Sequence, residues 1–218
     1  MLDSAEVDNG QELTLERLTE QVHGYTQSFD EIPVDPRHYT ILFQSEVLKN
    51  GKSYKLIYKA SKTQENKLVT KLSLVDIETS RKPDFQDTIS LRHPVNPLNV
   101  GRSDDDYVLS PEEAAFRYLQ VDLSPDPIEI RSRLEVKEAL QGQGIGSLLF
   151  DSFDLLASDV AHRSQVPDGK QLKLIVRDNS DPVGWTAARA EKNGYVRVPS
   201  NQSDSVFPTY QKIITSGK

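Results

Sequence analysis

The chain has 218 residues, enough for one full-sized domain or for one domain with a small appendage. Its net charge of −7 argues against the broad basic surface of a nucleic-acid-binding protein. Without cysteine it has no disulfide, thiolate metal site or cysteine nucleophile. The acidic start is unlike a signal peptide, and no apolar run approaches membrane-spanning length. We therefore expect a cytoplasmic protein that binds neither nucleic acid nor membrane.

The first part of the chain is predicted to form an amphipathic helix over residues 11–29. Asn9, with Glu12 three residues later, resembles a capping pair at the start of this helix. One apolar stripe follows from the spacing of Leu15, Leu18, Val22 and Tyr25. We accordingly assign residues 1–34 to an N-terminal helical segment and residues 35–218 to the main domain.

A strand-rich stretch comes next. Its three runs are rich in β-branched and aromatic residues and bounded by polar turns: His38–Leu48, Tyr54–Ala60 and Lys67–Ile77. Asn50-Gly51, between the first two runs, is typical of a tight hairpin because both residues tolerate positive φ. These features predict an antiparallel meander.

The middle of the chain is less regular. Residues 79–110 contain several prolines and an acidic run, and so predict a long irregular segment, either a surface excursion or a substrate lid. Ser110 as a cap and Pro111 in the first turn then predict a short helix that continues through Leu119.

The C-terminal half alternates between strands and helices. In chain order it predicts a strand at Ile128–Val136, a helix at Gly144–Ala161, a strand at Gln171–Val176, a helix over 182–193 and a strand at Val206–Ile214. Gly194 stands at a typical C-terminal cap position of the second helix. The whole pattern predicts a mixed α/β (α+β) fold.

Three alternating glycines carry the clearest functional signal. The predicted strand ending at Val136 leads through a short loop into a helix, and that loop ends in Gln141-Gly142-Gln143-Gly144-Ile145-Gly146. Glycines let the backbone approach a bulky anion and adopt positive φ. The first helical turn adds N–H groups without intrahelical partners and the positive end of the helix dipole. Together these features predict a diphosphate site that needs no basic side chain.

Other interpretations of these glycines fit less well. The spacing is G-x-G-x-G, whereas the dinucleotide-binding fingerprint is G-x-G-x-x-G and starts directly after a strand. A P-loop is excluded because no Gly-Lys-Ser/Thr follows. A tight strand-to-helix turn without any ligand remains the alternative.

The sequence resembles the GCN5-related N-acetyltransferase (GNAT) superfamily. Gln141–Gly146 matches that family's Q/R-x-x-G-x-G/A motif, and Leu134–Val136 matches the end of its fourth strand at the usual distance. Downstream, Gln171–Val176, Asn179 and the run ending in Gly194-Tyr195 look like its fifth strand, fourth helix and Gly-aromatic turn. The resemblance covers residues 128–196, about a third of the chain.

The resemblance implies a GNAT-like fold, with a central, mostly antiparallel mixed sheet flanked by helices, and acetyl-CoA or another acyl-CoA as donor. In this family the pantetheine arm runs between the splayed fourth and fifth strands, and a backbone N–H, here that of Val136, polarises the thioester carbonyl. The residues that would bind the donor are Leu134, Val136, Gln141, Gly142, Gln143, Gly144, Ile145, Gly146 and Asn179.

Catalytic residues are harder to assign from the resemblance. Glu135, on the fourth strand, stands where some relatives carry the base that deprotonates the amine, although it equally fits an outward-facing solvated residue. The family's tyrosine acid maps to Ala190, so the sequence departs from the pattern there. Either another hydroxyl replaces it, or water protonates the thiolate, or the protein is not a catalyst. Tyr195 and Tyr210 are the candidate hydroxyls, and we take Tyr210. Both also fit aromatic residues of the core.

These observations predict an acyl-CoA-dependent N-acyltransferase that transfers an acyl group directly to a primary amine in a ternary complex. The alternative is a non-catalytic acyl-CoA-binding sensor or scaffold module, and a structural domain with an empty site is a third interpretation. The four histidines show no metal-ligand spacing, so no metal is assigned. The amine acceptor, a small molecule or a protein, cannot be named from the fold.

Overall fold

The computed structural model describes residues 11–34, 39–62, 67–77, 113–178, 184–199 and 207–217, and the account below concerns these residues. The strands are β1 (Gln11–Glu12), β2 (Thr40–Lys49), β3 (Lys52–Lys62), β4 (Lys67–Asp76), β5 (Glu113–Asp122), β6 (Ile128–Val136), β7 (Gln171–Arg177), β8 (Val196–Arg197) and β9 (Thr209–Thr215). The helices are α1 (Leu15–Gly24), α4 (Ile145–Asp151), α5 (Phe153–Arg163) and α6 (Trp185–Lys192), and short 3₁₀ turns form at Phe29–Glu31 and Glu138–Leu140.

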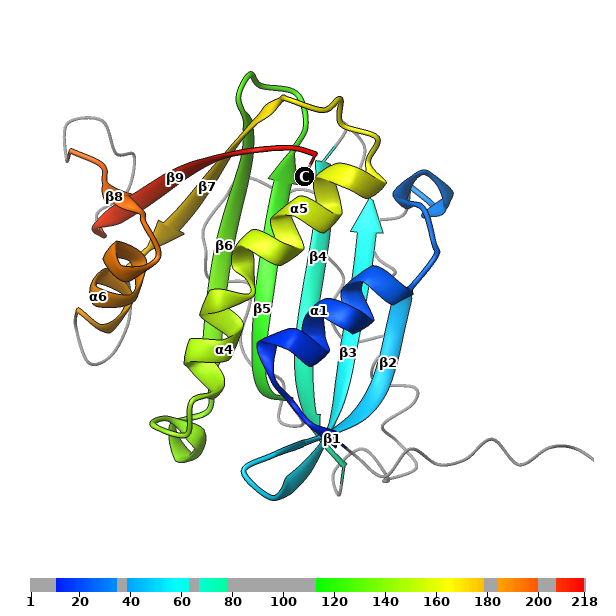
Figure 1. Ribbon diagram of the computed structural model, residues 1–218, viewed down its shortest axis with the longest axis vertical. Coiled ribbons are helices and arrows are strands. Elements are labelled where there is room, and N and C mark those ends of the chain that lie inside the picture. The colour runs from blue at the N-terminus through cyan, green and yellow to red at the C-terminus, as the bar shows by residue number, and fades with distance from the viewer. Residues whose placement is uncertain are drawn as a thin grey trace, which may run out of the picture.

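All the strands belong to one nine-stranded sheet in the order β1-β2-β3-β4-β5-β6-β7-β9-β8. The neighbouring strands pair antiparallel except for β1–β2 and β6–β7, which are parallel. Helices α1, α4 and α5 cross the same face of the sheet (Figure 1). The prediction of a mixed α/β fold around a mostly antiparallel sheet is confirmed.

Several local predictions are confirmed. Asn50 and Gly51 form the β2–β3 turn with φ of 52° and 75°, because both residues tolerate the left-handed region. The strand predicted at Ile128–Val136 is β6, with the same bounds. The long helix predicted over residues 144–161 is present as α4 and α5, which meet at Ser152 and share hydrogen bonds across it.

The helix predicted from Pro111 to Leu119 is wrong, because residues 113–122 form β5. Strand β5 lies inside the sheet between β4 and β6 and is buried on both faces. Its apolar residues therefore show no alternation with polar ones, and the sequence carries no period-2 signal. Arg117 points to the helix-covered face among phenylalanines, whereas Phe116 packs on the opposite face.

The N-terminal helix is also shorter than predicted. It begins at Leu15, where the Thr14 hydroxyl accepts a hydrogen bond of 3.1 Å from the backbone N–H of Arg17. Glu12 is not part of a capping box, because it lies in β1 and its carboxylate pairs with Lys49 at 3.2 Å. Asn9 lies outside the described residues. Helix α1 ends at Gly24.

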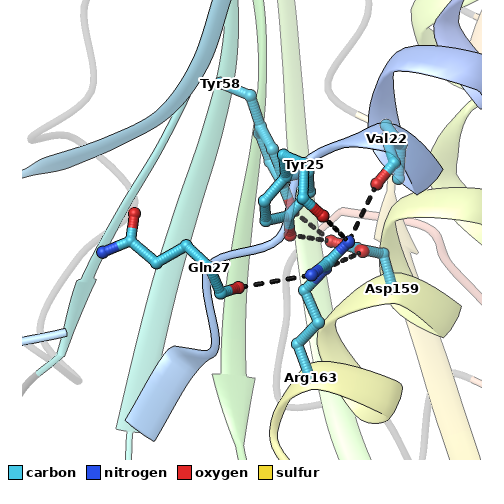
Figure 2. Close-up of polar contacts among 6 residues, drawn as sticks. All are labelled: Val22, Tyr25, Gln27, Tyr58, Asp159 and Arg163. Carbon is cyan, nitrogen blue, oxygen red and sulfur yellow. Dashed lines mark hydrogen bonds and ion pairs between the residues drawn. The ribbon is translucent and has the colours of Figure 1, made fainter. Parts of the chain in front are cut away.

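A buried polar network fastens α1 to α5, and Figure 2 shows its members pointing toward one another. The Asp159 carboxylate accepts hydrogen bonds from the hydroxyl of Tyr25 at 2.5 Å and from Nε of Arg163 at 2.7 Å. The guanidinium of Arg163 also donates to the backbone carbonyls of Val22, Tyr25 and Gln27. Arg163 thereby caps the end of α1, so residues 11–34 are integrated into the same core as the rest of the described chain.

The sheet face opposite the helices contains a second polar cluster. Nζ of Lys71 pairs with the Glu113 carboxylate at 2.7 Å, and the Ser73 hydroxyl donates to the same carboxylate at 2.8 Å. Nζ of Lys59 lies 4.6 Å from the centre of the Tyr39 ring. Burial and the neighbouring charge of Lys71 lower the pKa of Lys59 to about 8, whereas Glu113 opposes that shift.

This lowered pKa predicts that Lys59 costs the protein stability at neutral pH. In the unfolded chain the amine has its ordinary pKa near 10.4. Between about pH 8 and 10.4 the unfolded chain therefore binds more protons than the folded chain, and the free energy of unfolding rises with pH. We expect Lys59→Met to stabilise the protein by about 1–3 kcal/mol at pH 7 and to remove that rise. Urea unfolding from pH 7 to 10 measures both effects. The control is Lys55→Met on the same strand, and an equal gain there would contradict the prediction.

Within the described ranges no helix is long and apolar enough to cross a membrane. The same residues contain no group of three or more His, Asp or Glu side chains that could hold a metal ion.

Candidate functional site

The parallel strands β6 and β7 pair over only part of their length. Their register runs from Ile128 opposite Leu172 to Ser132 opposite Val176, and there it stops. On its other side β6 stays paired with β5 up to Val136. The last four residues of β6 therefore have β5 on one edge and no partner from β7 on the other.

Backbone amides of β6 face this unpaired edge. The N–H of Lys137 donates to the carbonyl of Ala114 at 3.0 Å, on the β5 side. Because successive residues of a strand direct their N–H groups to opposite edges, the N–H groups of Leu134 and Val136 point away from β5. The carbonyl of Val136 accepts a bond of 3.4 Å from the Gln141 side chain, consistent with that direction. Leu134 and Val136, the predicted donor-binding residues of β6, thus present backbone donors where β7 has diverged.

The glycine turn follows directly after this edge. Gly142 and Gly144 have φ of 76° and 79°, values that residues with a side chain rarely adopt. Gly144 precedes the first residue of α4, Ile145. An added Cβ at Gly142 or Gly144 would meet nothing within 4 Å, so one side of the turn is open. The predicted left-handed glycine conformations are present, and the turn has room beside it.

The amides of the turn lack acceptors. The N–H of Gln141 donates to Glu138 at 3.1 Å, and that of Leu148 donates to Gly144 at 3.0 Å. Between these two positions, residues 142–147 have no hydrogen-bond acceptor for their N–H groups in the described part of the chain. Six consecutive amides at a helix start form a site of positive potential for an anion.

Gly146 has a different role from the other two glycines. Its Cβ position lies 3.5 Å from the Trp185 ring and 3.5 Å from the Val136 side chain. These are ordinary van der Waals distances, so Trp185 packs α6 against the start of α4 beside Gly146. The Trp185 ring also makes an edge contact with Phe150 at 6.0 Å between ring centres.

The β2–β3 turn supports the glycine turn from the side. The side-chain amide of Asn50 donates a 2.8 Å hydrogen bond to the carbonyl of Gln143, across 93 positions of sequence. Gln143 in turn donates from its side chain to the carbonyl of Ala139 at 3.2 Å. Sequence analysis identified Asn50 only as a hairpin residue, since a contact between two distant turns leaves no local pattern.

The two candidate catalytic residues lie on opposite faces of the sheet. Tyr210 is opposite Val176 on β7, and Val176 is opposite Ser132 on β6. Residues in register share a face, so Tyr210 lies on the helix side, where it is buried in the core. Glu135, three positions after Ser132, lies on the other face. The structure does not bring these two side chains together on one face.

Glu135 has one carboxylate oxygen outside any hydrogen bond. Its Oε2 atom is buried and accepts no hydrogen bond from the described residues. Nη2 of Arg133 lies 3.6 Å from this oxygen. The carboxylate is therefore held on β6 by an ion pair, next to the edge where the amides of Leu134 and Val136 are exposed.

The sequence was also compared with known proteins. No family model matches the chain, and a search of curated proteins finds no match. The interpretation of the site therefore depends on its own geometry and chemistry.

The position that the family pattern gives to a tyrosine is Ala190, which has no hydroxyl. Ala190 is fully buried in α6. The hydroxyl of Tyr195 donates to the Asp154 carboxylate at 3.0 Å, and burial, together with that negative charge, raises the pKa of Tyr195. Tyr210 is buried on β9, where it pairs with Val176 of β7. Asn179, predicted to bind the donor, lies outside the described residues.

Proposed function

We propose that this chain is an acyl-CoA-dependent N-acyltransferase with a GNAT-like fold, and that β6, β7 and the glycine turn bind the donor. The observation that carries the proposal is the early end of β6–β7 pairing next to six amides without acceptors. An ordinary tight turn would explain the glycines. It would not explain why the adjoining strand edge is left open at the same end of the sheet.

In this proposal the donor occupies two neighbouring parts of the site. The diphosphate is bound by the amides of residues 142–147, which supply fixed donors at the start of α4. The pantetheine arm runs along the open edge of β6 and replaces the missing β7 partner. The thioester carbonyl then accepts a hydrogen bond from the N–H of Val136, which stabilises the oxyanion formed in transfer.

Transfer itself needs a neutral amine close to the thioester. Glu135, with an oxygen that accepts no hydrogen bond, takes the proton from the ammonium group directly or through water. The amine nitrogen attacks the thioester carbon, the C–N bond forms, the C–S bond breaks and the nitrogen loses its second proton. Water relays that proton to the leaving thiolate, because Ala190 offers no hydroxyl. Most of the rate gain comes from holding donor and amine together.

Calorimetric titration with coenzyme A and acetyl-CoA tests donor binding, and product formation with a panel of amines tests transfer. Binding with turnover supports the acyltransferase. Binding without turnover on any amine supports the alternative, a non-catalytic acyl-CoA sensor, which the buried Ala190 also favours. If neither coenzyme A nor acetyl-CoA binds, both the acyltransferase and the sensor proposals are overturned. The remaining interpretation is then a structural domain.

Asn50 is predicted to position the diphosphate turn. Asn50→Gly keeps the positive φ of the hairpin and removes the hydrogen bond to Gln143. We expect coenzyme A affinity to fall about fivefold, the value of one lost hydrogen bond, while the unfolding midpoint changes little. Gly51→Asn, in the same turn, is the matched control, since it retains the Asn50 amide. Unchanged affinity in Asn50→Gly would show that the contact does not support the site.

A further inference from the structure

Arg117 is a fully buried cation without a hydrogen-bonded anion. Its side chain on β5 is 0% exposed, and its Nε and Nη2 atoms have no hydrogen-bond partner in the described part of the chain. The guanidinium stacks against Phe153 at 4.3 Å and Phe150 at 5.2 Å from the ring centres. Burial lowers its pKa to about 10, which still leaves it charged at neutral pH. Burying a guanidinium with two unpaired nitrogen donors costs free energy of folding, unless an anion accepts hydrogen bonds from those donors.

The carboxylates near Arg117 are already paired with other cations. Asp151 is held by the guanidinium of Arg189, and Asp154 by the amine of Lys212 and the hydroxyl of Tyr195. Both carboxylates act on Arg117 only through their charge, without a hydrogen bond among the described residues. Among the described residues, the cluster thus has three cations, Arg117, Arg189 and Lys212, and two carboxylates. Counted over those residues, it is one negative charge short.

The cluster lies beside the proposed donor site. Arg117 is in register with Leu134, two residues beyond the last β6–β7 pair. From the guanidinium, contacts run through Phe150 to Trp185, and Trp185 lies against the position of Gly146 in the glycine turn. An aromatic wall therefore connects the open edge of β6 with the unpaired guanidinium, on the helix-covered face.

We propose that Arg117 binds the distal carboxylate of an ω-carboxyacyl group, so that the preferred donor is a dicarboxylic acyl-CoA such as succinyl-CoA. The inference rests on the proposed acyl-CoA site and specifies its acyl chain. A carboxylate supplies the one missing charge and accepts from Nε and Nη2 side by side, the geometry that a guanidinium favours. The apolar methylenes of the chain would lie along Phe150 and Trp185.

Calorimetric titration with succinyl-CoA and butyryl-CoA tests this, since the two acyl chains differ only in a terminal carboxylate or methyl group. We expect succinyl-CoA to bind at least about tenfold more tightly than butyryl-CoA, as for a charge-assisted pair. Equal affinity, or a preference for butyryl-CoA, would overturn the proposal while leaving the acyl-CoA site intact. If neither acyl-CoA binds, and coenzyme A itself does not bind either, the proposed donor site is overturned as well.

Variants of Arg117 assign the preference to this residue. Arg117→Met keeps an unbranched apolar stem, although a shorter one, and removes an uncompensated buried charge, so it is expected to fold. It should reverse the preference to favour butyryl-CoA, with coenzyme A affinity unchanged within about threefold. Arg117→Lys, which keeps the charge but loses the planar fork, should retain only part of the succinyl-CoA preference. A preference that survives in Arg117→Met would place the carboxylate elsewhere and overturn the assignment.

A free anion is the other source of the same chemistry. Thermal unfolding with acetate, chloride and succinate distinguishes it. If these salts raise the wild-type unfolding midpoint but not that of Arg117→Met, and succinyl-CoA shows no preference, the site takes a free anion and the acyl assignment is overturned. If the salts shift both unfolding midpoints equally, and succinyl-CoA binds the wild type more tightly than Arg117→Met, the acyl assignment is supported.

Discussion

Gly144→Glu is expected to weaken coenzyme A binding at least about a hundredfold, close to 3 kcal/mol. Gly144 has a φ of 79°, and forcing a residue with a side chain into that region costs about 1–2 kcal/mol in the free protein. The new carboxylate would stand beside the six open amides and repel the diphosphate, by about 1–4 kcal/mol at contact distance. Calorimetric titration of coenzyme A measures the loss.

The fold should survive this substitution. Nothing lies within 4 Å of the Cβ position at Gly144, so the side chain enters open space. Gly169→Glu is a matched control, because Gly169 also has a positive φ, 84°, and an open Cβ position, but it lies in the loop before β7. The two variants should lose similar stability, and only Gly144→Glu should lose binding. If coenzyme A bound both equally well, the glycine turn would not be a diphosphate site.

The elements that sequence predicts well are those with a local cause. The Asn50-Gly51 turn follows from two residues that accept positive φ, and β6 follows from its β-branched pattern between clear turns. The glycine turn belongs to the same class, because Gly142 and Gly144 are needed where the backbone is left-handed. Each of these features is encoded within a few residues, so a single sequence is sufficient to find it.

The features that sequence does not predict depend on distant parts of the chain. Strand β5 lies inside the sheet and is buried on both faces, so its sequence shows no alternation of apolar and polar residues. The prediction relied instead on Ser110 and Pro111, which suggested a helix. Arg117 carried no signal in the sequence, whereas the structure buries it against Phe150 of α4 and Phe153 of α5. The early end of β6–β7 pairing is likewise a property of two strands that are far apart in the sequence, with Ile128 opposite Leu172. None of these has a periodic signature.

Arg163 illustrates the energetic weight of such distant contacts, and Arg163→Met is expected to destabilise the protein by about 3–5 kcal/mol at pH 7. The guanidinium pairs with Asp159, and the substitution leaves that carboxylate buried without its cation. It also removes the donors to the carbonyls of Val22, Tyr25 and Gln27 at the end of α1. Urea unfolding at pH 7 measures the change.

The pH dependence of this loss identifies its cause. Burial already raises the pKa of Asp159, and Arg163 opposes that shift, so Arg163→Met raises the pKa further. A folded pKa above the unfolded value near 3.9 means that the native state binds the proton more tightly. The variant should therefore regain stability as pH falls toward 4, and the difference from wild type should shrink. Lys170→Met, which breaks an exposed pair with Asp126, should cost less than about 1 kcal/mol. A loss in Arg163→Met as small as in that control, or independent of pH, would mean that the buried ion pair does not hold α1 against α5.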